Sequence, residues 1–250
     1  LYKTIEKYYH IPWYYIAGID QYEHSLRNAR KDLPDSEGPI GIIISPEKWS
    51  GIYNPNPFDM VPERIAYFDG IGKDGNNDGK ADRNNPEDIL VSMATYLAQY
   101  GTNEDHIRLA LWNYYKRDKT VGMIMGNAKL FKKYEMVNLN DKAFPVPLTA
   151  NYSYRSTWGV ARGWGGRRSH EGTDVFADYG VPVRATCYGI VEIKGWNRFG
   201  GWRIGIRDIN NTYHYFAHLG SFTKDLNIGQ IVEPGMEIGT VGSTGYGPPV

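Results

Sequence analysis

The sequence predicts an α+β protein of two domains, with an all-helical domain first and an antiparallel β domain second. Over residues 1–137, apolar residues recur at helical spacing between residues that cap helices. Over residues 151–250, Gly, Val, Ile and aromatic residues alternate in short runs, as in β-strands. Between them, Pro145 and Pro147 mark residues 138–150 as a linker.

In the helical part, Pro12, Pro86 and Asn103 mark helix starts, because Pro is favoured at the first helical position and Asn at the N-cap. Gly101 ends one of these helices. The helices expected from these residues and from the apolar spacing cover residues 13–26, 86–100, 103–115 and 121–134.

In the β part, Gly, Asn and Pro separate five predicted strands, at residues 181–185, 188–193, 202–207, 212–217 and 237–241. Period-2 alternation at the end of the fourth run places His214, Phe216 and His218 on one face. This pattern predicts that His214 lines the same cleft as His218, although a surface or hydrogen-bonded histidine is the simpler interpretation.

Composition excludes several classes of protein. The 28 Lys and Arg residues balance 28 Asp and Glu, and a nucleic-acid binder would carry a basic excess. The single cysteine, Cys187, cannot form an internal disulfide, and we expect it to be a small buried residue of a strand. No apolar run has the length of a membrane span. Because the chain starts at Leu1 and not at Met, we expect a leader or membrane anchor upstream.

The stretch from Gly166 to Asp174 places His170 and Asp174 four positions apart in a Gly-rich turn. Imidazole nitrogen and carboxylate oxygen are ordinary zinc ligands, and a catalytic zinc site needs about three protein ligands plus water. Taken alone, such a spacing also fits a hydrogen-bonded turn. A second aromatic run, from Tyr213 to Leu219, carries the candidate histidine His218.

Further elements follow in a fixed order: Gly180-Val181-Pro182-Val183-Arg184-Ala185, Gly189-Ile190-Val191, Tyr215-Phe216-Ala217-His218-Leu219, Gly229-Gln230-Ile231-Val232 and Gly239-Thr240-Val241-Gly242-Ser243-Thr244-Gly245. From about Trp158 onwards, this series resembles the LytM-type (M23) zinc endopeptidases. The resemblance implies that His170 and Asp174 bind zinc and that His218 assists catalysis beside the metal.

The resemblance also implies a third zinc ligand in an H-x-H motif soon after the Gly-Ser-Thr-Gly segment. The sequence reaches Val250 without this motif, so we expect a truncated chain; loss of the ligand is the alternative. The implied function is hydrolysis of peptide bonds in the stem or cross-link peptides of bacterial peptidoglycan, outside the cytoplasm. The mechanism expected is metal-assisted amide hydrolysis, with His218 stabilising the oxyanion or moving a proton.

The helical part resembles the lysozyme-like lytic transglycosylases. The segments that match are Ile11-Pro12, Gln21-Tyr22-Glu23-His24-Ser25, Gly38-Pro39-Ile40-Gly41, Ser45-Pro46-Glu47-Lys48-Trp49 and Ala110-Leu111-Trp112-Asn113-Tyr114. Glu23 matches the family's catalytic acid, which must stay protonated in apolar surroundings. Trp13, Ile19 and Tyr22 are candidates for these surroundings, and Tyr114 is a candidate substrate contact.

Two departures from that family stand beside the match. Ile42-Ile43-Ile44 replaces a segment that usually carries Gln, and Tyr115 follows Tyr114 where the family favours Asn. Polar groups that would hold substrate near Glu23 are therefore missing. The domain is thus expected either to cleave glycan strands or only to bind them.

Between these segments, Asp74, Asn76, Asp78 and Asp82 occupy positions 1, 3, 5 and 9 of an EF-hand-like loop, with Gly79 at position 6. Asn85 replaces the usual bidentate Glu at position 12. The loop is a candidate calcium site, and the alternative is a solvated acidic turn.

Four arginines, Arg155, Arg162, Arg167 and Arg168, lead into the His170 motif. Stem peptides carry free carboxylates, which Arg binds through two hydrogen bonds, so Arg168 is a candidate substrate contact. A solvated basic face is the alternative.

Two other functions stay open besides the zinc endopeptidase. One is an inactive scaffold that binds the cell wall through two degenerate domains. The other is a muramidase or lytic transglycosylase that acts through Glu23, with the β domain serving only to bind the wall. All three share peptidoglycan, as glycan strands or stem peptides, as their partner.

Overall fold

The computed structural model describes residues 1–34, 38–162 and 168–245. The chain divides into two compact units, and each is described by itself. The helical unit comprises Leu1–Val137 with Ile209–Asn211, and the β unit comprises Asn138–Asp208 with Thr212–Val250. The coarse prediction of helices first and antiparallel sheets second is confirmed. None of the described helices is long and apolar enough to span a bilayer.

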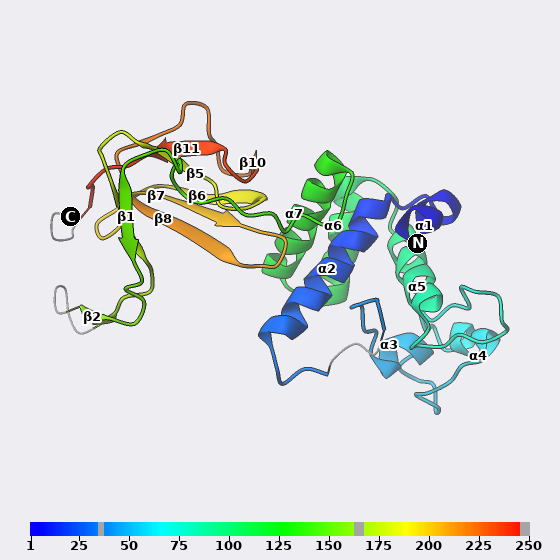
Figure 1. Cartoon of the computed structure of the whole chain (residues 1–250). Coiled ribbons are helices and arrows are strands. Elements are labelled where there is room, and N and C mark those ends of the chain that lie inside the picture. Colours follow the sequence, from blue (N-terminus) through cyan, green and yellow to red (C-terminus); the bar gives the residue numbers. More distant parts are fainter. Residues whose placement is uncertain (35–37, 163–167, 246–250) are drawn as a thin grey trace. The chain divides into compact units, whose positions relative to one another are not determined.

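The helices of the described chain all belong to the helical unit (Figure 1). They are α1 (Tyr2–Tyr9), α2 (Trp13–Ala29), α3 (Pro46–Ser50), α4 (Pro62–Tyr67), α5 (Pro86–Ala98), α6 (Glu104–Tyr115) and α7 (Asp118–Tyr134).

Side-chain caps explain where two of the predicted helices, α5 and α6, begin, whereas α2 and α7 have no side-chain cap. The side chain of Asn85 accepts hydrogen bonds from the backbone N–H groups of Glu87 and Asp88, and Pro86 occupies the first turn of α5. Asn103 accepts from the backbone N–H of His106 and starts α6 in the same way. Helix α7 begins at Asp118, three residues before the predicted start. The negative charge of Asp118 stabilises the helix there, because the N-terminus is the positive end of the helix dipole.

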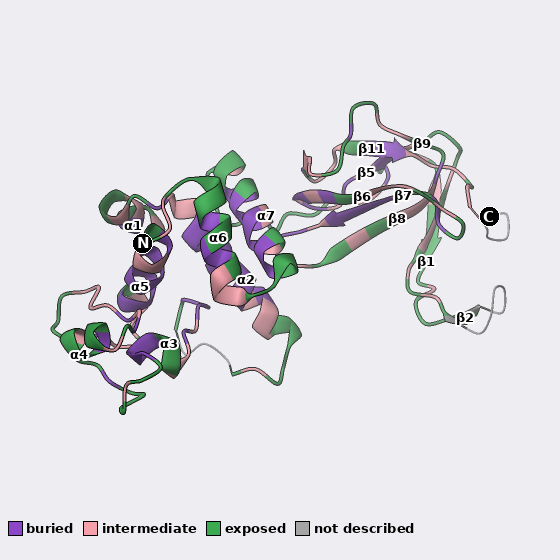
Figure 2. Cartoon of the chain, turned by 180° about the vertical axis from the view of Figure 1, so that it is seen from behind, coloured by how far each residue is buried: buried purple, intermediate pink, exposed green. Residues whose placement is uncertain are grey.

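Helices α2 and α7 pack side by side (Figure 1). Gly18 permits this contact, because a Cβ at this position would lie 2.9 Å from the carbonyl oxygen of Ile124 on α7. The buried faces of the helices meet in one apolar core (Figure 2). Its largest fully buried side chains include Trp49, Ile16, Ile19, Leu90, Met93 and Leu97.

The β unit consists of short antiparallel sheets. The largest has the strand order β10-β6-β7-β8, and a second has the order β5-β11-β9; β1 pairs with β4 and β2 with β3. The strands are β1 (Tyr152–Arg155), β2 (Ala161–Arg162), β3 (Arg168–Ser169), β4 (Asp174–Ala177), β5 (Pro182–Arg184), β6 (Gly189–Asn197), β7 (Gly201–Arg207), β8 (Tyr213–Leu219), β9 (Ser221–Phe222), β10 (Ile231–Val232) and β11 (Glu237–Thr240).

Residues 138–150, predicted to form a linker, belong to the β unit. Lys142 forms a backbone bridge with Cys187, and the N–H of Arg184 donates to the carbonyl of Pro145 across 2.7 Å. Val146 is buried. The proline spacing that predicts a linker is therefore also compatible with an irregular segment packed against a sheet, since Pro fixes φ and lacks an N–H donor but does not prevent packing.

Strand β8 contains a bulge beside the candidate site. Trp202 of β7 pairs with Leu219 and Ile204 pairs with Phe216, so β8 has one residue more than β7 in this interval. The extra length falls on Ala217 and His218, and His218 has a φ of 60°. The bulge interrupts the period-2 alternation on which the sequence-based placement of His214, Phe216 and His218 on one face depends.

Candidate metal centre and its cleft

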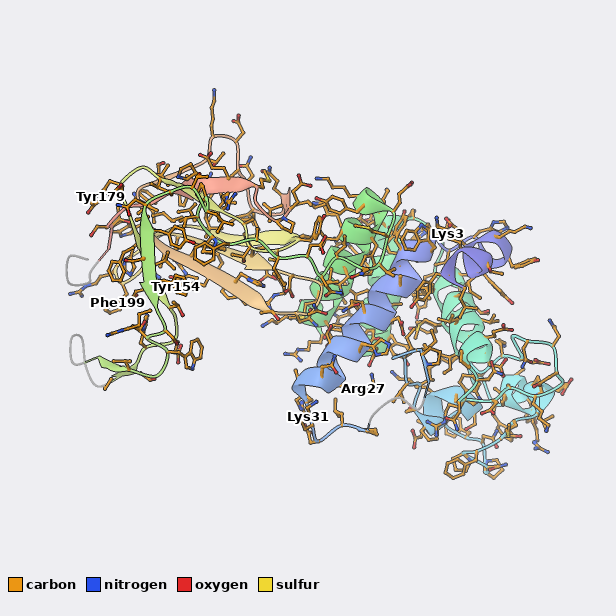
Figure 3. All side chains as sticks on the ribbon, viewed as in Figure 1. Lys3, Arg27, Lys31, Tyr154, Tyr179 and Phe199 are labelled. Carbon is orange, nitrogen blue, oxygen red and sulfur yellow. The ribbon has the colours of Figure 1, made fainter. Side chains whose placement is uncertain are left out.

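The candidate site occupies an open cleft of about 1520 Å³ in the β unit. His170, Asp174 and His218, which the sequence singles out, all line it, together with His214 and Thr186. Aromatic residues form part of its wall, among them Tyr179 and Phe199, which are labelled in Figure 3. The fold thus brings together three residues that lie up to 48 positions apart in the sequence.

A short ladder to the segment 157–160 fixes the backbone of His170. The N–H of His170 donates to the carbonyl of Val160 across 2.9 Å, and the N–H of Gly159 donates to the carbonyl of His170 across 2.7 Å. Asp174 begins β4, where it pairs with Arg155 of β1. Backbone hydrogen bonds therefore hold His170 at one side of the turn and Asp174 at the other.

The imidazole of His170 is oriented for metal binding. Its Nδ1 lies 3.2 Å from the carbonyl oxygen of Thr157. A carbonyl oxygen only accepts, so Nδ1 carries the proton and Nε2 carries the lone pair in the neutral ring. This is the arrangement found around metal-binding histidines, in which the second ring nitrogen donates to a backbone carbonyl or carboxylate.

The ligand atoms of His170 and Asp174 are correctly spaced for one zinc ion. Nε2 of His170 lies 3.5 Å from Oδ1 of Asp174. Two ligands at about 2.1 Å from a tetrahedral zinc ion are about 3.4 Å apart. A Cβ added at Gly172 would lie 3.4 Å from Nε2 of His170, so glycine keeps the approach to this nitrogen open. The residues present therefore fit zinc.

Thr157, which sequence reasoning missed, contacts both ligands. Besides its carbonyl contact to His170, its hydroxyl lies 3.5 Å from Oδ2 of Asp174 and 3.4 Å from the backbone nitrogen of Asp174. The sequence gives little indication that Thr157 contacts the ligands, because it precedes His170 by 13 positions and approaches it only in the folded chain.

His218 lies at the bulge of β8 with its ring held from one side. Its Nδ1 donates to the carbonyl oxygen of Thr244 across 2.7 Å, which leaves the lone pair of the neutral ring on Nε2. Thr244 belongs to the Gly-Ser-Thr-Gly segment, and its hydroxyl also donates to the carbonyl of Leu219. This segment therefore orients the histidine to which the family resemblance assigns a catalytic role.

Glu23 lies on α2 in the helical unit and is only 6% exposed. Its Oε1 accepts from the hydroxyl of Tyr115 across 2.7 Å, and its Oε2 accepts from Nη1 of Arg27 across 3.0 Å (Arg27 is labelled in Figure 3). Burial raises the pKa of Glu23, while the bonds from Tyr115 and Arg27 oppose the rise. Ile19 and Tyr22, two of the three residues expected to form apolar surroundings, are buried, and the rings of Tyr22 and Tyr115 meet edge to face. The contacts of the Glu23 carboxylate named above are polar.

Tyr115, which the sequence comparison counted as a departure, thus contacts the carboxylate directly. Tyr114, the candidate substrate contact, instead binds Lys48: the ammonium lies 3.6 Å from the centre of the ring and 2.9 Å from the carbonyl oxygen of Tyr114. Arg167 and the side chain of Arg168 lie outside the described residues.

The candidate calcium loop is satisfied by its own backbone. Asp74 accepts from the N–H groups of Asp78 and Gly79, Asp78 accepts from that of Lys80, and Asp82 accepts from that of Asn84. Asn76 accepts from the N–H of Asp78. The carboxylates of this loop are not among the described groups of three whose ligand atoms gather within 4.8 Å. The structure therefore gives no support to calcium here.

Comparisons with known proteins agree with this site. The model of peptidase family M23 matches residues 168–249, which include His170, Asp174 and His218. The L-Ala--D-Glu endopeptidase of Bacillus subtilis (strain 168) is 63% identical over 249 residues, which cover 100% of this chain and 76% of that protein. The chain belongs to peptidase family M23, a family of zinc metallopeptidases. It is a hydrolytic endopeptidase of peptidoglycan.

Two other comparisons cover a smaller share of this chain. The glycyl-glycine endopeptidase ALE-1 of Staphylococcus capitis is 36% identical over 80 residues, covering 31% of this chain and 22% of that protein. The solved catalytic domain of lysostaphin from Staphylococcus simulans is 31% identical, covers 40% of this chain and 74% of its own, and aligns with a TM-score of 0.36.

Proposed function

We propose that this chain hydrolyses the bond between L-Ala and D-Glu in the stem peptides of peptidoglycan, with zinc held by His170 and Asp174. The observation that carries the proposal is the 3.5 Å spacing of Nε2 of His170 and Oδ1 of Asp174, in the same cleft as His218. The specificity is taken from the relative that is 63% identical over 249 residues. We expect this chain to act outside the cytoplasm, where peptidoglycan lies.

The chemistry that zinc supplies in such a site is Lewis acidity, which polarises the scissile carbonyl and lowers the pKa of the attacking water. The chain's own residues complete the reaction. His170 and Asp174 supply two ligands, and the proposal includes a third from the H-x-H segment that the family resemblance implies. His218, held through Nδ1 by Thr244, presents Nε2 for proton transfer or for a hydrogen bond to the developing oxyanion.

The test of specificity uses purified muropeptides and the full-length protein. The expected products are glycan fragments that end in L-Ala and free peptides that begin with D-Glu, identified by mass spectrometry. Products cut only at the cross-link between stem peptides would contradict the proposed bond while leaving the enzyme class intact. The His170→Ala protein is the control for a contaminating peptidase.

We also propose that the helical unit is a lysozyme-like domain that binds glycan strands, with Glu23 in a structural role. Both oxygens of Glu23 are engaged by Tyr115 and Arg27, and the residue is 6% exposed, so a glycosidic oxygen has no room beside it. Aromatic side chains of the segment 52–67 are strongly exposed instead: Tyr53 by 84%, Phe58 by 71% and Tyr67 by 80%. These exposed aromatic rings are the candidates for contact with sugar rings of the glycan strand.

Sedimentation with purified glycan strands tests this second proposal. Replacing Tyr53 and Tyr67 by Ala should lower the bound fraction, whereas Glu23→Gln should not change it. Glycan fragments that disappear in Glu23→Gln would show instead that the helical unit cleaves the strand.

A further inference from the structure

A second group of metal-binding side chains lies in the β unit, apart from His170 and Asp174. The sulfur of Cys187, a carboxylate oxygen of Asp208 and a ring nitrogen of His214 all lie within 4.8 Å of one another. Among the residues that the structure describes, this is the one group of three such donors brought so close. Cys187 and Asp208 are buried and His214 is partly exposed.

Three different parts of the fold supply these donors. Cys187 lies between β5 and β6, Asp208 follows β7 and His214 belongs to β8. The N–H of Asp208 donates to the carbonyl of Thr212 across 3.1 Å, which closes the end of the β7–β8 ladder around the carboxylate. His214 lies within β8, whereas Cys187 lies in an isolated backbone bridge with Lys142 and Asp208 immediately follows β7. Backbone hydrogen bonds therefore hold all three donors in place.

The buried carboxylate of Asp208 already has a cation beside it. Nζ of Lys142 lies 2.9 Å from Oδ2 of Asp208, and Nε2 of His214 lies 3.0 Å from the same oxygen. The side chain of Asp208 is 2% exposed, whereas that of Lys142 is 48% exposed. A carboxylate this deeply buried needs a positive partner, but the lysine ammonium can return to water at small cost.

Thr186 contacts the ring nitrogen of His214 that would not bind the metal, as the hydrogen-bond partner of a metal-binding histidine does. Its hydroxyl lies 2.9 Å from Nδ1 of His214. A hydroxyl can donate to Nδ1 while Nε2 donates to Asp208, and can accept from Nδ1 when Nε2 binds a metal. The contact therefore persists in both states of the ring, which is what a metal-binding histidine requires.

From these contacts we propose that Cys187, Asp208 and His214 form a second cation site, which takes Zn²⁺ or a similar divalent metal in exchange for the ammonium of Lys142. The donor set of one sulfur, one imidazole nitrogen and one carboxylate oxygen suits zinc. Three protein donors leave one position of a four-coordinate zinc ion for water. Binding releases the thiol proton of Cys187 to solvent and moves Nζ of Lys142 away from Asp208.

The second site shares no donor with the first, which is proposed on His170 and Asp174. Cys187 and Asp208 do not line the cleft that contains His170 and Asp174. The second ion is therefore structural.

Cobalt substitution tests the proposal without any measurement of cleavage. Co²⁺ bound by a thiolate gives a charge-transfer absorption in the near ultraviolet, and Cys187 is the one cysteine of the sequence. We expect this band in the His170→Ala protein, in which the first site is disabled, and its loss in Cys187→Ser and in His214→Ala built on that background. Lys142→Met should lower the dissociation constant for Co²⁺ roughly fivefold, because it removes the competing cation.

Control measurements distinguish loss of the cobalt site from loss of folding. Circular dichroism checks that each variant is folded, and Cys187→Ala serves if Cys187→Ser is not. Absence of the band in folded His170→Ala protein at saturating Co²⁺ overturns the proposal. A band that survives in both Asp208→Asn and His214→Ala also overturns it, since Cys187 would then bind the metal without these partners.

Discussion

Nδ1 of His218 donates to the carbonyl oxygen of Thr244 across 2.7 Å, so the lone pair of the neutral ring lies on Nε2. The zinc ligands proposed for the same cleft are His170 and Asp174, and His218 is not among them. The proposed mechanism therefore separates metal binding from proton transfer, and this separation can be measured.

In the full-length protein, His218→Ala should lose about a hundredfold or more of its activity on muropeptides while keeping its zinc. His170→Ala and Asp174→Ala should lose both activity and zinc. Turnover and metal content, measured on the same preparations, check the pairing. Loss of zinc in His218→Ala would mean that this residue is a ligand, and full activity would mean that it is only a strand histidine.

Thr157→Val should weaken zinc binding about tenfold, the usual scale for a residue that orients metal ligands. The variant removes the hydroxyl near Asp174 but keeps the backbone carbonyl that holds Nδ1 of His170. Competition with a metal-binding dye gives the dissociation constant. Thr157→Ser, which retains the hydroxyl, should bind as the natural protein does; equal weakening in both variants would assign the effect to packing.

Glu23 should make the stability of the helical unit depend on pH. Burial raises the pKa of Glu23 from its ordinary value of 4.5, so the folded state holds this proton more tightly than the unfolded state does. Its contribution is therefore fully present below pH 4.5 and is lost as the pH rises through the folded-state pKa.

Urea unfolding across this pH window should show a falling free energy of unfolding for the natural protein. Glu23→Gln, which does not ionise, should show a flatter dependence. The matched control is Glu104→Gln, which removes an exposed i,i+4 partner of Arg108 and should leave the slope unchanged. A slope that persists in Glu23→Gln would assign the effect to another group.

Asp88 should matter more to stability than any carboxylate of the acidic loop. It is fully buried and accepts from the N–H groups of Gly75, Asn76 and Asp82. Asp88→Ala would leave these donors without an acceptor and should cost about 3 kcal/mol in the free energy of unfolding. Asp78→Ala, on the exposed side of the loop, should cost under about 1 kcal/mol, and added Ca²⁺ should not raise the melting temperature of the natural protein.

Sequence reasoning found the elements whose causes are local. Asn103 and Pro86 begin helices through contacts within one turn. Cys187 is buried, as expected, but it lies in an isolated bridge between β5 and β6 and not in a strand. Contacts between distant residues could not be read in this way. Tyr115 looked like the loss of a polar group, yet its hydroxyl meets Glu23 from 92 positions away.

The candidate site shows the same division. His170 and Asp174 could be predicted from the sequence because both lie within five residues of one Gly-rich turn. Thr157 and Thr244, which orient the histidines, reach them only when separate strands pair. The cluster of Cys187, Asp208 and His214 has no sequence spacing of its own, since three elements of the β unit bring it together.

The bulge in β8 determines which face of the sheet each later side chain of this strand takes, and His218 is one of these side chains. One added residue shifts every later side chain to the opposite face, so the segment around Ala217 sets the phase in which His218 meets the cleft. A strand of the same composition but one residue shorter would keep its apolar core contacts on one side and lose the histidine's orientation. Deletion or insertion of one residue at this point should therefore be tolerated less than a substitution of Ala217, although neither change alters a metal ligand.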